Sequence, residues 1–265
     1  MSYDATAKPA RTDALVRFAH LYEAYLQAEI DMTLSPEESM GNEWYAGVGE
    51  SGAKAVTLAC MSSWLSDVRT VLDMPCGHGR VLRHLVKLFP GAVFDACDID
   101  KPGIEFCASQ FGATPILSKA RPEDVAFPRK YDVIWIGSLF THTTQDLTLR
   151  WIRQLASHLT EAGIIVATFH GRFSALNGEA FGYIEPPIWR KIVKGYERGG
   201  YGYQNYSQPA HDGNVPGDYG ISLSKASHIL ALIEQMKDLR IFNYIERGWA
   251  GHHDVLVIGK PQVGV

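Results

Sequence analysis

Long hydrophobic runs are missing from this sequence. Its apolar stretches are short, such as residues 133–136 and 164–167, whereas a membrane-spanning helix needs about 20 apolar residues. The first residues, Met1 to Asp4, lack the charged segment and the apolar segment of a signal peptide. We therefore expect no membrane association and no signal peptide.

Cysteine is scarce and follows no recognisable pattern. Four cysteines stand at positions 60, 76, 97 and 107, and no two of them form a C-x-x-C pair. Their spacing matches no common zinc module. We expect reduced thiols that pack as small apolar side chains, no bound metal ion, and a cytoplasmic location.

An excess of positive charge is also missing. The chain has 25 Lys and Arg residues against 29 Asp and Glu residues, for a net charge of -4. Nucleic acids and anionic membranes favour a basic face, so we expect neither as a partner. The 265 residues, 46% of them hydrophobic and 20% charged, suit an ordinary globular protein with one large core.

The first 66 residues are predicted to form a helical cap. Apolar residues at helical spacing predict a helix over residues 13–31, and Ser35-Pro36 follows its end. A second helix is expected over residues 51–65, after a loop that contains Trp44, Tyr45, Gly47 and Gly49. The apolar stripe of the first helix would consist of Leu15, Phe18, Ala19, Tyr22, Leu26 and Ile30.

Strands and helices alternate from residue 68 onward. The expected strands cover residues 68–74, 92–99, 115–117, 131–137, 164–169, 239–245 and 254–259. The expected helices cover residues 79–89, 101–111, 146–159 and 224–236, the last of them capped by Ser224. This alternation predicts βαβ units and an α/β fold with a parallel sheet in residues 67–265.

Residues 172–223 interrupt the alternation. They contain nine glycines and six of the twelve tyrosines. We interpret them as an insertion after the fifth strand that covers one edge of the sheet. Glycine permits motion and tyrosine combines an apolar ring with a polar tip, which favours a substrate lid with Tyr201 and Tyr203 as contacts. A structural insertion or a dimer contact is the alternative.

The most informative segment is V-L-D-M-P-C-G-H-G-R, residues 71–80. It places Asp73 at the end of the first strand, before Gly77, Gly79 and a helix. The glycines allow a ligand to approach the backbone, and the helix start offers unpaired N–H groups. A dinucleotide fingerprint would need a small residue where Leu82 stands, and the Asp73 carboxylate would repel a pyrophosphate. The segment therefore favours a ligand with a cationic ammonium or sulfonium group.

The second strand supplies another carboxylate, Asp98, nineteen residues after Gly79. An acidic residue at this strand end can accept both hydroxyl protons of a ribose. S-adenosylmethionine carries a ribose and a cationic sulfonium, so it fits a cavity shared by Asp73 and Asp98. The alternative roles are a turn-forming residue for Asp73 and a helix N-cap for Asp98.

Four segments together resemble the class I S-adenosylmethionine-dependent methyltransferases. The first motif of that family is similar to residues 71–80, and the second to A-C-D-I-D. Its fourth strand and the loop after it resemble Y-D-V-I-W-I-G-S-L-F-T-H, and its turn into the fifth strand resembles L-T-E-A-G-I-I-V-A-T. The resemblance implies a three-layer Rossmann-like sandwich. Its seven-stranded, mostly parallel sheet would end in an antiparallel last strand.

The resemblance also implies S-adenosylmethionine as the cofactor and roles for single residues. The glycine turn would contact the methionine part through Asp73, Pro75, Cys76, Gly77 and Gly79. Asp98 would bind the ribose, and Ile99 would pack on the adenine. The resemblance implies further contacts from Glu123 and Asp124 at the adenine and from Ser138 and Leu139 on the inner side. Many members of the family have Asp where Arg121 stands here, so the adenine contact departs from the family pattern.

Methyl transfer to a hydroxyl or a protonated amine requires a base. His142 and His170 follow the fourth and fifth strands, at the edge where open α/β sheets bind ligands. They are the predicted bases, and a surface or packing role is the alternative for each. Trp44 and Tyr45 are predicted to close over the cofactor or the substrate, or else to pack within the cap.

These observations predict an S-adenosylmethionine-dependent methyltransferase that acts by in-line displacement on a small-molecule or saccharide acceptor, at oxygen or nitrogen. The N-P-P-Y tetrapeptide of many DNA and protein amide methyltransferases is not present. A nicotinamide-dependent oxidoreductase and a non-catalytic S-adenosylmethionine-binding module are the alternatives. The oligomeric state stays open, with a homodimer as one option.

Overall fold

The computed structural model describes residues 8–207 and 219–260. At its centre lies a seven-stranded sheet in the order β3-β2-β1-β4-β5-β9-β8. The strands are β1 (Thr70–Asp73), β2 (Val93–Asp98), β3 (Thr114–Leu117), β4 (Tyr131–Ile136), β5 (Leu159–His170), β8 (Arg240–Trp249) and β9 (His253–Gly259). Strands β1 to β5 pair in parallel, and β9 is antiparallel to both of its neighbours. The predicted sheet, with its antiparallel last strand, is confirmed.

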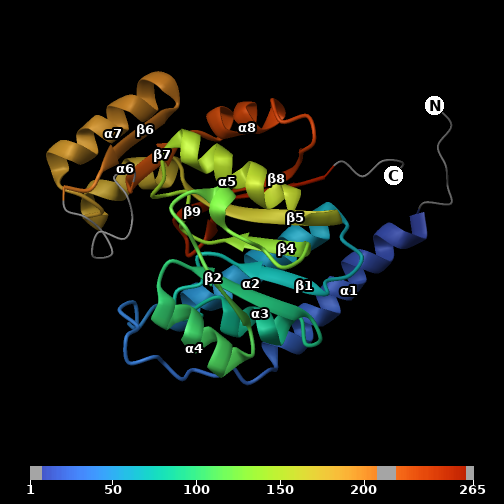
Figure 1. Cartoon of the computed structure of the whole chain (residues 1–265). Coiled ribbons are helices and arrows are strands. Elements are labelled where there is room, and N and C mark those ends of the chain that lie inside the picture. The colour runs from blue at the N-terminus through green and yellow to red at the C-terminus, as the bar shows by residue number, and fades with distance from the viewer. Residues whose placement is uncertain (1–7, 208–218, 261–265) are drawn as a thin grey trace, which may run out of the picture.

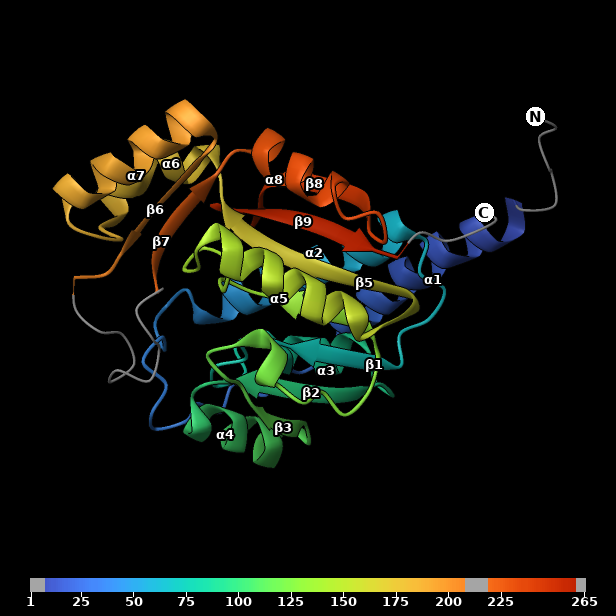
Figure 2. The same cartoon turned by 45° about the horizontal axis from the view of Figure 1, so that its top comes forward.

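Helices cover both faces of this sheet (Figures 1 and 2). One layer consists of α1 (Lys8–Leu26), α2 (Tyr45–Ser63), α3 (Leu82–Leu88) and α4 (Lys101–Phe111). The opposite layer consists of α5 (Gln145–Ser157) and α8 (Ala226–Glu234). Together with the sheet they form the expected three-layer Rossmann-like sandwich.

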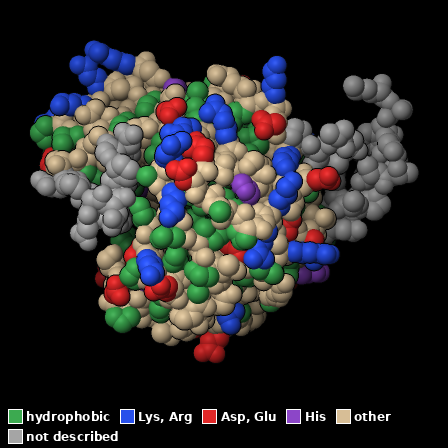
Figure 3. All heavy atoms as spheres, viewed as in Figure 1, with side chains coloured by type: hydrophobic (Ala, Val, Ile, Leu, Met, Phe, Trp, Pro, Cys, Tyr) green, Lys and Arg blue, Asp and Glu red, His purple; other side chains and the backbone are tan. Residues whose placement is uncertain are grey.

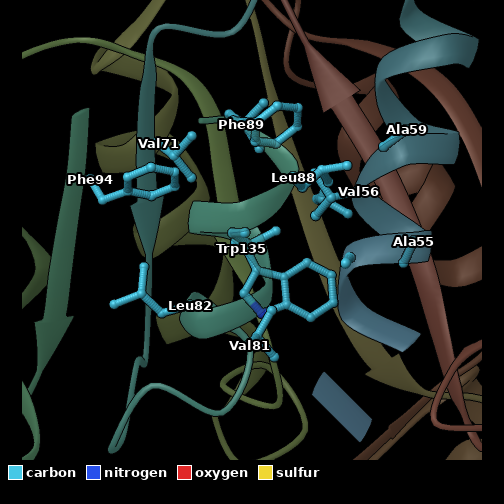
Figure 4. Close-up of a cluster of buried hydrophobic side chains, with 14 of the residues drawn as sticks. Ala55, Val56, Ala59, Val71, Val81, Leu82, Leu88, Phe89, Phe94 and Trp135 are labelled. Atoms are coloured by element: carbon cyan, nitrogen blue, oxygen red, sulfur yellow. The ribbon is translucent and has the colours of Figure 1, made fainter. Parts of the chain in front are cut away.

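The alternation of side chains along the central strands builds two hydrophobic cores. Val71 and Trp135 point into the core under α2 and α3, whereas Leu72 and Ile134 point into the core under α5 and α8. Figure 4 shows the Trp135 indole beside Val81 and the small side chains of α2. Both faces of the parallel strands are therefore buried, which explains their continuous apolar sequences.

The N-terminal segment differs from its prediction in two ways. Helix α1 ends at Leu26, not at residue 31, and it buries Ala14, Phe18 and Tyr25, while Leu15 and Leu26 are exposed. Helix α2 begins at Tyr45, so the loop predicted at this point is wrong. Gly49 there serves helix packing, since a Cβ on it would lie 2.3 Å from the Arg80 carbonyl oxygen. Helices α1 and α2, which belong to the predicted cap of residues 1–66, share their core with β1 and β4.

The insertion after β5 has regular structure of its own. It contains α6 (Arg172–Phe181), α7 (Pro186–Gly199) and the two-stranded sheet of β6 (Tyr201–Asn205) and β7 (Gly220–Ser224). Six buried side chains form a separate small core, among them Trp189, Ile192 and Leu223. Ser224 pairs with Tyr201 at the end of β7, and α8 begins after Lys225 without a side-chain cap, so the predicted Ser224 cap is wrong.

Within the described residues, none of the helices combines the length and the apolar character that crossing a membrane requires.

Candidate active site

The carboxyl ends of β1, β2 and β4 meet at one edge of the sheet and open into a cavity of about 440 Å³. Asp73 ends β1, Asp98 ends β2, and Ser138 follows β4, and all three line the cavity. The glycine turn, residues 75–78, forms another part of its wall. The two carboxylates thus share one cavity, as their positions in the sequence predicted.

The glycine turn is held by one of these carboxylates. The backbone N–H of Gly77 donates to Asp98 Oδ2 at 2.7 Å, and the N–H of Asp100 donates to Oδ1 at 3.0 Å. Gly77 and Gly79 have φ angles of 49° and 78°, in the left-handed region that favours glycine. A Cβ on Gly103 of α4 would lie 2.5 Å from the Gly77 carbonyl oxygen. The turn and α4 therefore pack without room for a side chain at Gly103.

Two buried acids, Asp73 and Asp98, make this end of the cavity favourable for a cation. Asp73 is buried, and its Oδ2 atom has no hydrogen-bond partner among the described residues. Burial and the nearby Asp98 carboxylate raise the pKa of Asp73 well above its usual value. Burial also raises the pKa of Asp98, although hydrogen bonds from Asp100 and Gly77 oppose the shift. A cationic ligand would relieve both effects.

Another part of the cavity wall follows β3. Ser118, Lys119, Ala120 and Arg121 line it, together with Ile99. The backbone N–H of Ser118 donates to the Asp98 carbonyl oxygen at 2.7 Å, which fixes this segment beside the β2 strand end. The sequence analysis did not predict that these four residues line the cavity, although their place directly after the third strand could have indicated it.

Glu123 and Asp124 do not line the cavity, contrary to the prediction. They lie in the short 3-10 helix η2 (Pro122–Asp124). Both oxygens of Glu123 accept from Arg150, at 2.9 and 2.6 Å, and this pairing lowers the pKa of Glu123 to about 2. The pairing directs the carboxylate toward α5, and Arg150 itself lines the cavity.

The loop after β4 carries Ser138, Leu139 and His142, which all line the cavity. Ser138 has a φ angle of 64°, and its N–H donates to Thr168 Oγ1 at 2.8 Å. His142 Nδ1 lies 2.9 Å from the Gly220 carbonyl oxygen and 3.1 Å from the Tyr206 hydroxyl. Its ring stacks on that of Tyr219, with the ring centres 4.9 Å apart. The insertion therefore contacts the predicted base directly.

His170 does not line the cavity. Its side chain is buried, its ring stacks on Tyr183, and Nδ1 lies 3.3 Å from the Ser222 carbonyl oxygen. Burial lowers the pKa of His170 to about 3, and the neighbouring His142 and His252 act in the same direction. This environment is that of a packing histidine, which was the alternative interpretation of its position.

The predicted substrate aromatics also lie outside the cavity wall. Trp44 is 70% exposed at the start of α2. Tyr45 is buried, and its hydroxyl donates to Glu38 Oε2 at 3.0 Å. Tyr201 donates to the Thr143 carbonyl oxygen at 3.1 Å, and Tyr203 donates to Asn205 within β6. Tyr219, another tyrosine of the insertion, does line the cavity.

The comparisons with known proteins agree with this arrangement. Residues 72–165, from β1 to β5, match the family model of a methyltransferase domain. No curated protein sequence matches the chain.

Solved structures share the fold at low sequence identity. A crystal structure of an S-adenosylmethionine-dependent methyltransferase from Clostridium acetobutylicum is 14% identical, covering 93% of this chain and 99% of its own, with a TM-score of 0.55. The N-terminal domain of EvdMO1 with S-adenosylhomocysteine bound is 13% identical, covering 95% and 97%, with a TM-score of 0.51. An O-methyltransferase family 2 protein from Planctomyces limnophilus in complex with apigenin is 14% identical, covering 84% and 64%, with a TM-score of 0.50.

Residues 72–165 therefore match a methyltransferase domain. The sheet around them has the fold of the solved S-adenosylmethionine-dependent methyltransferases to which the chain is similar.

Proposed function

We propose that this enzyme methylates a hydroxyl group of a small-molecule acceptor, with His142 as the general base. The observation that carries the proposal is the position of His142. It lines the same cavity as Asp73 and Asp98, and its ring is fixed by the insertion.

The residues of the cavity fit S-adenosylmethionine. Asp98 would accept from the ribose hydroxyls, since its carboxylate retains acceptor capacity beyond the two backbone N–H groups it already binds. Asp73, with its unpartnered Oδ2 atom, would face the cationic end beside Pro75, Cys76 and Gly77. Ile99 and Leu139 would enclose the adenine and the inner side. The bound cofactor supplies an electrophilic methyl group on its sulfonium.

The protein would contribute the base and the orientation of the acceptor. The Gly220 carbonyl oxygen can only accept a hydrogen bond, so the short contact favours the proton on His142 Nδ1. The lone pair then lies on Nε2, the nitrogen that can take a proton from an acceptor hydroxyl. The stacked Tyr219 ring holds the imidazole in plane. Positioning of the acceptor oxygen against the methyl group supplies the remaining rate enhancement.

A small-molecule acceptor is supported by the size and composition of the site. A cavity of about 440 Å³ falls in the range of small-ligand pockets. Figure 3 shows acidic and basic side chains interspersed on one face of the molecule, without the segregation that nucleic-acid binding favours. The related apigenin-bound O-methyltransferase has a small-molecule ligand. The described part of the insertion, residues 172–207 and 219–223, contributes Tyr219 to the cavity wall and would form the substrate side of the site.

The experiment measures methyl transfer from S-adenosylmethionine to a panel of phenols, sugars and amines, followed by kinetics of His142→Asn. Asn can keep the donor to Gly220 but provides no base. We expect kcat to fall by about 100-fold or more with an unchanged Kd for S-adenosylhomocysteine. His20→Asn, an exposed site on α1, is the matched control and should behave as wild type.

The outcomes separate the parts of the proposal. Unchanged kcat in His142→Asn would remove the base assignment. Transfer to amines without transfer to hydroxyls would contradict O-methylation. Binding of a nicotinamide dinucleotide in place of S-adenosylhomocysteine would overturn the cofactor assignment.

A further inference from the structure

Strand β7 of the insertion pairs with the loop that carries His142. The backbone N–H of Gly220 donates to the His142 carbonyl oxygen at 2.9 Å, and the N–H of Ser222 donates to the Thr141 carbonyl oxygen at 2.9 Å. The loop after β4 therefore has a hydrogen-bonded neighbour along its backbone. This pairing fixes the point from which the imidazole of His142 extends.

The side chain of Tyr206 reaches the same ring nitrogen as the Gly220 carbonyl group. Tyr206 follows β6, and its hydroxyl lies 3.1 Å from His142 Nδ1, whereas the Gly220 carbonyl oxygen lies 2.9 Å from that atom. The N–H of Tyr206 donates to the Tyr219 carbonyl oxygen at 3.2 Å, and the centres of the two tyrosine rings are 5.8 Å apart. The Nδ1 atom thus faces two oxygen atoms, both supplied by the insertion.

The two oxygen atoms differ in the hydrogen bonds they can form. The Gly220 carbonyl oxygen can only accept, so the short contact places a hydrogen on His142 Nδ1. The Tyr206 hydroxyl can donate or accept, and its oxygen then accepts a share of the same N–H group. When Nε2 takes up a proton, the imidazole becomes a cation. Both hydrogen bonds from Nδ1 become stronger, because a charged donor binds more strongly than a neutral one.

We propose that Tyr206 is a positioning residue for His142, and that its hydroxyl accepts from Nδ1 together with Gly220 and thereby strengthens Nε2 as a base. The inference rests on the proposed function for the role of His142. Tyr206 itself does not line the cavity, so it would act through the imidazole and not on the ligand. The insertion would then take part in the chemistry as well as in the substrate side of the site.

The other titratable groups around His142 remain neutral near pH 7 or are unchanged by a substitution of Tyr206. His170 of β5 and His253 of β9 interact electrostatically with His142, and burial lowers the pKa of His170 to about 3 and that of His253 well below its usual value. Burial raises the pKa of Tyr219, which stacks on the imidazole, and the Asp98 carboxylate raises it further.

The Tyr206 hydroxyl itself remains protonated over the same range. Burial raises the pKa of Tyr206 to about 12. A proton that binds to this group of rings near neutral pH therefore binds to His142, and a change in its pKa measures the contribution of the hydroxyl.

The test is nuclear magnetic resonance of the protein with isotope-labelled histidine, saturated with S-adenosylhomocysteine. Proton–nitrogen correlation spectra distinguish the two neutral tautomers of a histidine, and their pH dependence gives its pKa. The signal of His142 is the one lost in His142→Asn. We expect the hydrogen of neutral His142 on Nδ1. In Tyr206→Phe we expect the pKa of His142 to fall by about 0.5–1 pH unit, because the cation loses one acceptor.

Kinetics with an acceptor from the panel provide a second measurement. Tyr206→Phe should lower kcat about threefold, because a weaker base accepts the proton less readily. The Kd of S-adenosylhomocysteine should be unchanged, which also reports that the variant is folded. Tyr22→Phe is the matched control, since Tyr22 is a half-buried tyrosine of α1 outside the cavity wall, and it should leave the pKa of His142 as in wild type.

Contrary results separate the inference from the proposed function. A hydrogen on Nε2 in wild type, or an unchanged pKa of His142 in Tyr206→Phe, would overturn the inference. A raised pKa would overturn it too, since the hydroxyl would then donate to Nδ1. Each of these results, combined with loss of kcat in His142→Asn, would leave the base assignment intact. Full kcat in His142→Asn would overturn the base assignment, and the inference with it.

Discussion

Gly103 offers a strict test of the described site geometry. It is buried in the first turn of α4, and a Cβ there would lie 2.5 Å from the Gly77 carbonyl oxygen and 3.0 Å from Asp100 Oδ2. A carbon and a carbonyl oxygen normally approach to about 3.3 Å. Gly103→Ala therefore requires the glycine turn and α4 to separate by roughly 0.8 Å. The atom that must move belongs to the residue whose N–H binds Asp98.

Two opposing effects determine the change in the free energy of unfolding of Gly103→Ala. Alanine favours a helix over glycine by up to about 1 kcal/mol, whereas overpacking against backbone costs about 1–3 kcal/mol. We expect Gly103→Ala to lower the free energy of unfolding by about 1 kcal/mol. Displacement of the hydrogen bond between Gly77 and Asp98 should also raise the Kd of S-adenosylhomocysteine about tenfold.

Urea unfolding and calorimetric titration measure the two quantities. Gly47→Ala is the matched control, because Gly47 is an exposed glycine of α2 and a Cβ added there would have no atom within 4 Å. That variant should be unchanged or more stable by up to about 1 kcal/mol. If Gly103→Ala gains stability to the same extent and binds S-adenosylhomocysteine normally, the close packing of the turn against α4 is refuted.

Three further predictions concern buried polar groups. Asp98→Asn should raise the Kd of S-adenosylhomocysteine at least about tenfold in calorimetric titration. The Asn amide group presents a donor where two backbone N–H groups and the ribose hydroxyls need acceptors. Equal affinity of the variant and wild type would contradict the ribose role of Asp98. Arg83→Met should lower the free energy of unfolding in urea by about 3 kcal/mol. The buried Arg83 guanidinium donates to the hydroxyl of Tyr45 and to four carbonyl oxygens, those of Gly79, Asp31, Thr33 and His78. A loss under about 1 kcal/mol would argue against this hydrogen-bond network. Burial lowers the pKa of His170 from the ordinary value of 6.5 to about 3 in the folded protein. The contribution of neutral His170 to the free energy of unfolding is therefore complete above pH 6.5 and declines as the pH falls toward 3. Urea unfolding at pH 7 and pH 5 should show an acid-induced loss about 2 kcal/mol larger in wild type than in His170→Gln, and identical losses would exclude a buried neutral His170.

The sheet and the two acids of the site, Asp73 and Asp98, could be predicted because the patterns that indicate them lie within short segments of the sequence. The buried strands are short, continuous apolar segments, and the alternation with amphipathic helices determines a parallel sheet. Asp73 and Asp98 stand directly at strand ends, and parallel strands bring those ends to one edge. No long-range information was needed to place both carboxylates in one cavity.

The errors arose where packing decided the local structure. The glycines at residues 47 and 49 indicated a loop, but in the folded chain Gly49 gives α2 its close contact with the Arg80 backbone. His142 and His170 looked equivalent in sequence, each after a strand. The insertion covers His170 and leaves His142 on the cavity wall. Glu123 was predicted to border the ligand, yet the distant Arg150 draws its carboxylate away.

The sequence by itself determined the order of strands and helices, the glycine turn and the two acids, because backbone preferences and burial periodicity act between near neighbours. The tertiary structure alone decided which cations and aromatic rings face the ligand. Ser118 and Tyr219 line the cavity through contacts between segments that are apart in the chain, with Asp98 and His142 respectively. No pattern along one segment records which partner a side chain will find across the fold.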